Sequence, residues 1–276
     1  MSDFILGAVA YDAKVVTIWD GFRAWFAERG LPFDYVLYTS YERQVDAHLR
    51  GDVQVAWNSP LAWLQAQRLA KKHGRTASAI AMRDTDRDLT SVILVRADGP
   101  KSVADLRGKR VGVGAADSPQ ATLIPLLALA EAGLEPGRDF EVQRHDVLLG
   151  KHGDHIGGER DAVKALLAGK VDAACLIDGN RLAFAREGLL APNATRVLVQ
   201  TPAYDHCNMT VLDGGPPETA RFRELLLGMS YDDPQVRPLL DLEGLKVWQP
   251  GRTEGYAVLE RAIDRFHTID PWLAAR

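Results

Sequence analysis

Residues 102–113 read SVADLRGKRVGV, and this stretch decides how the chain is organised. It follows a break in composition at residues 97–102, ADGPKS, where small, charged and proline residues interrupt the apolar pattern. From there, apolar strand-like runs alternate with amphipathic stretches as far as the run TRVLV at residues 195–199. This alternation is typical of βαβ units and a mainly parallel sheet, so the stretch predicts a self-contained α/β region that starts well inside the chain.

The same alternation precedes the break. Residues 4–10 are predicted to form a strand, and Ile18, Phe22 and Phe26 then form one apolar helix face because one helical turn separates each from the next. The β-branched run at residues 90–95 is expected to cross out of the first region. Further strands are predicted at residues 36–38, 53–57 and 79–82, with helices at 42–49 and 60–71 between them.

The chain is expected to return to the first region after the second one. A second break, Thr201-Pro202, precedes the strand-like residues 207–212, and few strands accompany the helices predicted after it. One α/β lobe is therefore inserted into another, and two hinge strands join them. The predicted boundaries are residues 1–96 and 203–276 for lobe one, residues 99–200 for lobe two, and hinges near 96–99 and 200–206.

Composition limits the function. The 276 residues carry a formal net charge of −4, with Lys and Arg spread along the chain, so no basic surface for nucleic acid is predicted. No apolar run approaches the roughly 20 residues of a membrane-spanning helix, so the chain is not expected to be membrane-embedded. Residues 1–7 lack the features of a signal peptide. This predicts a cytoplasmic protein if Met1 is the native start, and a periplasmic or membrane-anchored one if a signal was removed; two cysteines fit either compartment.

Two Ser-Pro pairs stand at equivalent places. Ser59-Pro60 follows a predicted strand in lobe one, and Ser118-Pro119 follows one in lobe two. Serine is a favoured N-cap and proline a favoured first helical residue, so each lobe is expected to aim a capped helix N-terminus from the end of a strand. Such termini suit anions, and ligands of open parallel sheets gather at the carboxyl ends of the strands. The alternative is that each hydroxyl merely caps its own helix.

Four segments resemble the phosphonate/phosphite substrate-binding proteins of ABC importers. They are residues 102–113 (quoted above), SPQATLIP at 118–125, DAVKALLAGKVDAACLID at 161–178 and GDVQVAWNSP at 51–60, and the likeness extends over most of residues 3–215. The resemblance implies the type II periplasmic-binding-protein fold, with two doubly wound α/β lobes on two hinge strands. It also implies a solute-binding protein that closes over one small anionic ligand, phosphonate- or phosphate-like or a carboxylate, with an ABC transporter permease as partner.

The resemblance further implies which positions contact the ligand. These are an aromatic residue after the first strand, a polar loop after the third, a Ser/Thr-rich helix start, a histidine before the Asp-Ala-Val helix and an acid after the VDAA strand. The residues at these positions are Tyr11, Asn58, Ser59, Ser118, Gln120, Thr122, His152 or His155, and Asp178. Asp117 adds a negative charge to the anion cradle and Pro119 removes a backbone donor, so a ligand with an amine or a ring stays open.

Residues 145–159, HDVLLGKHGDHIGGE, are rich in histidine, glycine and charge. We interpret them as a flexible loop that presents His152 and His155 to an anionic ligand. A metal site with His152, His155 and Glu159 as ligands is one alternative, because imidazole and carboxylate are ordinary metal ligands. A solvated loop without a ligand is the other.

His206 and Cys207 begin the predicted return strand. His206 is expected to face the ligand, and either residue could complete the metal site of the loop. Neighbouring strand residues point to opposite faces, so His206 is not expected to activate the Cys207 thiol, although His152 or His155 could. The alternative function is therefore a cytoplasmic enzyme of the same fold, acting on a small anionic or aromatic-acid substrate through the His-rich loop and Cys207. The sequence assigns no catalytic residue, and no cofactor is expected.

Overall fold

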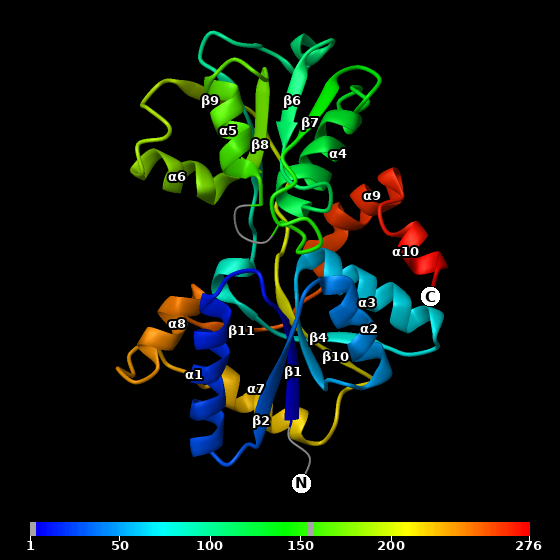
Figure 1. Cartoon of the computed structure of the whole chain (residues 1–276), viewed down its shortest axis with the longest axis vertical. Helices are drawn as coiled ribbons and strands as arrows, with labels where there is room; N and C mark the ends of the chain where they lie inside the picture. The colour runs from blue at the N-terminus through cyan, green and yellow to red at the C-terminus, as the bar shows by residue number, and fades with distance from the viewer. Residues whose placement is uncertain (1–3, 154–156) are drawn as a thin grey trace. The chain divides into compact units, whose positions relative to one another are not determined.

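The computed structural model describes residues 4–153 and 157–276, and Figure 1 shows their helices and strands. The chain divides into two compact units. Unit 1 contains the residues up to Arg87 together with Asp205–Gly255 and Ile269–Arg276, whereas unit 2 contains Asp88–Tyr204 and Tyr256–Thr268. Each unit is built on one sheet that carries helices, so the α/β class predicted from the alternating pattern is confirmed.

Unit 1 alternates strands and helices through its first part. Its strands are β1 (Phe4–Val9), β2 (Phe33–Tyr38), β3 (Val55–Asn58), β4 (Ala77–Arg83), β10 (Asn208–Leu212) and β11 (Trp248–Pro250). Its helices are α1 (Lys14–Glu28), α2 (Tyr41–Arg50), α3 (Pro60–Lys72), α7 (Glu218–Leu227), α8 (Arg237–Glu243) and α10 (Asp270–Ala274), with a 3₁₀ turn η1 (Asp84–Asp86).

The sheet of unit 1 has the strand order β11-β4-β10-β3-β1-β2. Strand β1 is parallel to β2 and β3, whereas β10 is antiparallel to both β3 and β4. The carboxyl ends of β1, β3 and β4 therefore share one edge of the sheet with the start of β10. In the register Asn208 lies opposite Asn58, which fixes where the return strand meets this edge.

Unit 2 follows the same plan with a smaller sheet. Its strands are β5 (Ser91–Arg96), β6 (Arg110–Val113), β7 (Glu141–Arg144), β8 (Ala173–Ile177) and β9 (Thr195–Gln200), in the order β7-β6-β8-β5-β9. Strand β6 is parallel to β7 and β8, and β5 is antiparallel to β8 and β9. Its helical segments are η2 (Val103–Leu106), η3 (Pro119–Leu123), α4 (Ile124–Glu131), α5 (Glu159–Leu167), α6 (Asp178–Arg186) and α9 (Ala257–Phe266), and η4 (Glu254–Tyr256) precedes α9.

The chain enters unit 2 earlier than the sequence boundary near 96–99 implies. Strand β5 falls in the predicted lobe one, but it pairs only with strands of unit 2 among the described residues. Ile93 and Val95 of this strand are fully buried in the unit 2 core. Helix α9 also belongs to unit 2, because Phe266 packs on the same core. The first crossing between the units is therefore at Arg87/Asp88, and the C-terminal part of the chain is divided between the two units. Both follow from tertiary packing, which no local sequence pattern indicates.

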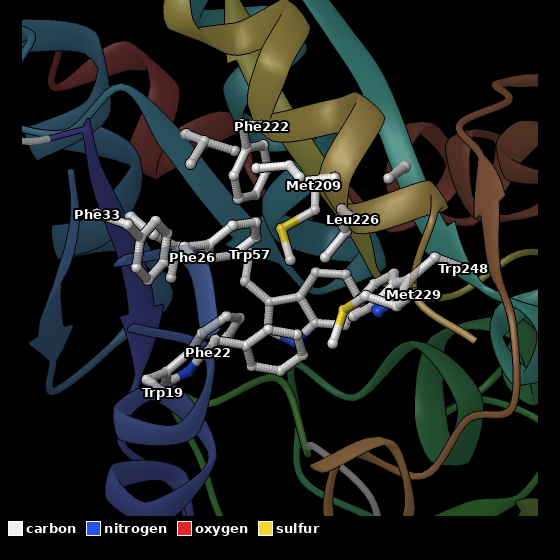
Figure 2. Close-up of a cluster of buried hydrophobic side chains, with 14 of the residues drawn as sticks. Trp19, Phe22, Phe26, Phe33, Trp57, Met209, Phe222, Leu226, Met229 and Trp248 are labelled. Carbon is white, nitrogen blue, oxygen red and sulfur yellow. The ribbon is translucent and has the colours of Figure 1, made fainter. Parts of the chain in front are cut away.

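The core of unit 1 is rich in aromatic side chains (Figure 2). Helix α1 contributes the predicted apolar face, in which Ile18, Phe22 and Phe26 are buried. The rings of Trp57 and Trp248 meet edge to face with centroids 5.7 Å apart, which joins β3 to β11. Large rings packed in this way supply much of the apolar burial that stabilises such a unit. Within the described residues, no helix combines the length and the apolarity that crossing a membrane would require.

Candidate ligand site

The candidate residues of unit 1 gather at one edge of its sheet. Strands β1 and β3 end there and lead into Tyr11 and Ser59, and β10 starts there with Asn208 opposite Asn58. His206 stands two residues before Asn208. The strand order therefore brings Tyr11, Asn58, Ser59 and His206 to the same edge.

Asn58 is fully buried and uses its amide inside the unit. Its Nδ2 donates to Thr210 Oγ1 at 2.8 Å, and its Oδ1 accepts from Gln44 Nε2 at 2.8 Å. The Thr210 hydroxyl donates onward to Asn208 Oδ1 at 2.7 Å. These bonds join α2, β3 and β10, and buried networks of this kind hold one register. In this structure Asn58 thus holds together the sheet edge at which the other candidate ligand-binding residues lie.

Tyr11 follows β1 and Ser59 follows β3 at this edge of the sheet. The Ser59 hydroxyl accepts from the backbone N–H of Ala62 at 3.1 Å, with Pro60 as the first residue of α3, so the predicted N-cap is confirmed. Tyr11 is half-buried, and the Lys14 ammonium lies 5.8 Å from the centre of its ring. This corner of unit 1 therefore offers an aromatic face, a cation and a helix N-terminus.

The side chains of His206 and Cys207 are in contact. His206 Nδ1 lies 3.0 Å from Cys207 Sγ and 3.5 Å from Asp86 Oδ1. Strand β10 begins only at Asn208, so the alternation of a pleated strand does not apply to the two residues before it. The prediction that these side chains point apart was wrong.

In unit 2, strand β6 leads into the helical segment that Ser118 opens. The Ser118 hydroxyl accepts from the backbone N–H of Ala121 at 3.2 Å, which confirms the predicted cap. The N–H of Leu123 bonds to the carbonyl of Ser118, an i→i−5 bond, so the first turn is π-helical. Pro125 has no N–H to continue the backbone ladder, and the π-helical turn ends two residues before it.

Gln120 and Thr122 are buried and hydrogen-bonded within unit 2. Gln120 Nε2 donates to the carbonyl of Gly153 at 2.8 Å, and Thr122 Oγ1 donates to the carbonyl of Ala115 at 2.8 Å. A Cβ placed on Gly153 would lie 2.7 Å from Ser118 Oγ. The loop at Gly153 therefore rests directly on the start of the helical segment, and Gln120 holds it there.

The described part of the histidine loop is exposed at Val147 and Leu149, but its end at His152 is buried in the unit. His152 is 1% exposed and has a φ of +53°, and Leu148 has a φ of +61°. Non-glycine residues seldom adopt this left-handed region, and such positions concentrate at functional sites. His155 lies outside the described residues, so its proposed contact with the ligand stays a prediction.

Asp178 directly follows β8 and begins α6, as the sequence predicts for the acid after the VDAA strand. Its backbone N–H donates to the carbonyl of Thr90 at 2.9 Å. Arg181 Nε donates to its carboxylate at 2.9 Å, and both side chains are about one third exposed. Asp178 is thus an accessible acid with a partial counter-charge.

Glu159 is the residue whose chemistry the sequence understated. It is fully buried at the start of α5, and its Oε2 accepts from Asn180 Nδ2 at 2.8 Å and from the N–H of Ile177 at 3.1 Å. Burial raises the pKa of this carboxyl to about 8, so it is mostly protonated at neutral pH. A metal ligand must give up its proton, so a carboxyl in this state is a poor metal ligand at neutral pH. The metal site with His152, His155 and Glu159 includes a residue outside the described part of the chain and stays a prediction. The sequence feature that could have drawn attention to Glu159 is its position directly after two glycines at the start of a helix.

Ser91 and Tyr204 also lie at this edge of the unit 2 sheet. No sequence pattern had indicated either residue as part of the site. The Ser91 hydroxyl donates to the carbonyl of Gln120 at 2.6 Å and lies 2.8 Å from the Tyr204 hydroxyl. The N–H of Ser91 donates to Thr201 Oγ1 at 2.9 Å. Because Ser91 pairs with Ile177 in the register, these groups share an edge with the carboxyl ends of β6 and β8.

A comparison with protein families agrees with this arrangement. Residues 7–256 match the family described as the periplasmic substrate-binding protein of the phosphonate ABC transporter. The chain belongs to this family. The resemblance inferred from the four sequence segments is therefore confirmed, and with it the class of ABC-transporter substrate-binding proteins. Family membership by itself assigns no ligand to the residues described above.

Solved structures of similar proteins establish the fold. PhnD1 of Prochlorococcus marinus, solved with methylphosphonate, is 18% identical with a TM-score of 0.71, over 96% of this chain and 98% of that one. A Xanthomonas citri protein solved with ATP is 18% identical with a TM-score of 0.74, over 96% and 99%. The periplasmic aliphatic sulphonate binding protein SsuA of Escherichia coli is 17% identical with a TM-score of 0.58, over 97% and 92%. The predicted type II periplasmic-binding-protein fold is thus confirmed.

Proposed function

We propose that this protein is the periplasmic solute-binding component of an ABC importer, and that its two units close over one small anionic ligand, phosphonate- or phosphate-like or a carboxylate. The observation that carries the proposal is that each unit of this chain has a serine-capped helix start at the edge of its sheet. Ser59-Pro60 after β3 and Ser118-Pro119 after β6 each open a helical segment at the edge where parallel strands end.

The chemistry of these edges suits an anion. Helix N-termini present backbone N–H groups and the positive end of the helix dipole, and both favour negative charge. Unit 1 adds the Tyr11 ring and the Lys14 ammonium beside it. In unit 2 the buried Glu159 carboxyl is mostly neutral at pH 7, so it adds little negative charge near the Ser118 segment. Similar proteins were solved with methylphosphonate or are named for aliphatic sulphonate, which are small anions with an alkyl group.

Closure needs segments that can act as hinges, and we place them where the chain passes between units. These points are Arg87/Asp88, Tyr204/Asp205 and Gly255/Tyr256. On the unit 1 side, the N–H of Asp205 donates to the carbonyl of Gly255 at 2.9 Å, and Arg252 binds the Asp205 carboxylate through two contacts of 2.6 Å. These contacts hold two of the crossing segments together on the unit 1 side.

The family description also bears on location and partner. It names a periplasmic protein of an ABC transporter, so it does not support the cytoplasmic interpretation, and we propose a permease of that transporter class as partner. Fractionation of cells that carry the native gene, with detection of the protein in the periplasmic extract, tests the location. Recovery in the cytoplasmic fraction alone would contradict it.

Titration calorimetry with methylphosphonate, inorganic phosphate, methanesulfonate and acetate tests the ligand class, and native mass spectrometry of freshly purified protein identifies what co-purifies. We expect Ser118→Ala to weaken binding of the preferred anion by about 1–2 kcal/mol, the strength of a hydrogen bond to a charged group. The matched control is Ser102→Ala, which removes an N-cap at η2, before β6 rather than after it.

Ser102→Ala is expected to lower only the melting temperature, since its cap contributes about 1 kcal/mol to stability and meets no ligand. If Ser118→Ala likewise changes the melting temperature and leaves affinity intact, Ser118 is a cap and not a ligand contact. If none of the four anions binds and a neutral or cationic molecule co-purifies, the proposed ligand class is wrong.

A further inference from the structure

Unit 1 holds a buried cluster of three different side chains at the base of its crossings. Asp86, His206 and Cys207 place one ligand-type atom each within 4.8 Å of the others. Their exposed fractions are 1%, 7% and 4%. Asp86 stands directly before the Arg87/Asp88 crossing, and His206 stands directly after Asp205 at the next one. The role proposed for this cluster does not depend on the ligand class assigned to the protein.

Backbone hydrogen bonding explains why the three side chains meet. The N–H of His206 donates to the carbonyl of Asp86 at 2.8 Å, so the segment before β10 is tied to the turn η1. Because that segment is not yet part of β10, the side chains of His206 and Cys207 are free to lie on the same side. One position in the fold thus gathers an imidazole, a thiol and a carboxylate from two separate segments.

The charges around the cluster leave room for a cation. Arg83 binds both carboxylate oxygens of Asp86, at 2.6 and 2.9 Å, and its guanidinium also meets the Glu243 carboxylate at 3.4 Å. The Asp86 and Glu243 carboxylates therefore share the Arg83 guanidinium. A divalent ion would balance the negative charge that a deprotonated Cys207 thiol adds beside Asp86. Buried charges persist only when they are balanced in this way.

The donor types and distances select the class of ion. Thiolate, imidazole and carboxylate are the ligands that Zn²⁺ takes in proteins, and three of them leave a fourth position open. Tetrahedral bonds of about 2.3 Å to sulfur and about 2.0 Å to nitrogen put those two atoms roughly 3.5 Å apart. His206 Nδ1 and Cys207 Sγ are 3.0 Å apart, and His206 Nδ1 and Asp86 Oδ1 are 3.5 Å apart, so small side-chain rotations suffice.

Arg83 can orient the Asp86 carboxylate for metal binding, because it hydrogen-bonds both of its oxygens. Carboxylates that bind a metal are commonly hydrogen-bonded on their far side, which orients them. Each carboxylate oxygen has a further lone pair, so Asp86 Oδ1 can keep Arg83 and still bind an ion. We propose that Asp86, His206 and Cys207 bind a divalent transition-metal ion of the Zn²⁺ class at the base of the unit 1 crossings.

Cobalt(II) provides a direct test, because bonding of Co²⁺ to a thiolate produces a charge-transfer absorption in the near ultraviolet. We expect this band when Co²⁺ is added to the purified protein, its disappearance when Zn²⁺ displaces Co²⁺, and a higher melting temperature with Zn²⁺. Binding should weaken as pH falls, since the imidazole and the thiol must both be deprotonated.

Variants assign the band to this cluster. Cys207→Ser should abolish the band. His206→Gln should keep a band but weaken Co²⁺ affinity at least about tenfold, because even the loss of a residue that only hydrogen-bonds a metal ligand weakens metal binding by about that factor. The matched control is Cys175→Ser, which removes the other buried thiol, in unit 2, and should leave band and affinity unchanged. Circular dichroism confirms that each variant is folded, and the two cluster variants are independent should one fail to fold. A wild-type protein without the band, a band that survives Cys207→Ser, or one lost in Cys175→Ser would overturn the proposal.

Discussion

The Asp117 carboxylate accepts a hydrogen bond from the backbone N–H of Gly150 at 2.7 Å, 33 residues away along the chain. In the sequence, Asp117 places a negative charge beside the residues expected to bind an anion, which would weaken that binding. In the structure its carboxylate faces an N–H of the histidine loop, which accounts for an acid at this place. The same contact joins the loop to the residue just before the Ser118 cap.

Replacing Asp117 with alanine is expected to release the loop. The loss of one hydrogen bond to a charged acceptor should lower the free energy of unfolding by about 1–2 kcal/mol and speed amide hydrogen exchange at Gly150. Asp172→Ala is the control, because Asp172 accepts from the N–H of Arg110 at the opposite end of β6, at 2.9 Å. If exchange at Gly150 rises equally in both variants, the loop is not anchored by Asp117.

A Cβ at Gly153 should be far more costly than one at Gly137. Both glycines have positive φ, +61° and +77°, but an added Cβ would meet Ser118 Cβ at 2.6 Å at Gly153 and nothing within 4 Å at Gly137. Both alanine variants bear the conformational cost of about 1 kcal/mol, and Gly153→Ala adds the clash. Thermal unfolding of the two variants isolates this difference. Equal melting temperatures would show that the loop does not pack on Ser118.

Glu159 should make the protein less stable as pH rises. Its folded pKa of about 8 exceeds the ordinary 4.5, because burial disfavours the charged form. The carboxyl thus ionises first in the unfolded chain, so stability is full below about pH 4.5 and declines as pH rises through 8, by up to about 5 kcal/mol. Glu159→Gln should remove this slope in unfolding curves measured from pH 5 to 8.5. Glu187→Gln is the control, since a hydrogen bond from Arg160 lowers the pKa of Glu187. A slope that persists in Glu159→Gln would assign it to another group.

His48 should make the protein less stable as pH falls. Its ring is 2% exposed and lines a pocket of about 220 Å³ together with Arg75. Burial, and then the charge of Arg75, lower its pKa from 6.5 to about 4. The unfolded chain therefore binds the proton first, so stability is lost as pH falls from 6.5 through 4, by up to about 3 kcal/mol. His48→Gln should flatten the acid limb of the stability curve, and His73→Gln at an exposed position should not. Identical acid limbs in all three proteins would contradict the assignment.

Local sequence patterns were enough to predict the apolar face of one helix and the two caps. The spacing of Ile18, Phe22 and Phe26 predicted the buried face of α1, and both Ser-Pro pairs stand where helices begin. Such signals are local, because a cap or an apolar face depends on residues within two turns of one another. Local signals failed for β5, whose place depends on pairing with β8 and β9 from much later in the chain.

The sequence by itself determined the α/β class, the family and the residue types at the two sheet edges, because these follow from local spacing and short motifs. The tertiary structure alone decided what those residues touch. It set Asn58 inside a buried network, turned His206 toward Cys207 and buried Glu159 deeply enough to raise its pKa. Contacts of this kind join segments as distant as Asn58 and Thr210, and no pattern within one segment contains them.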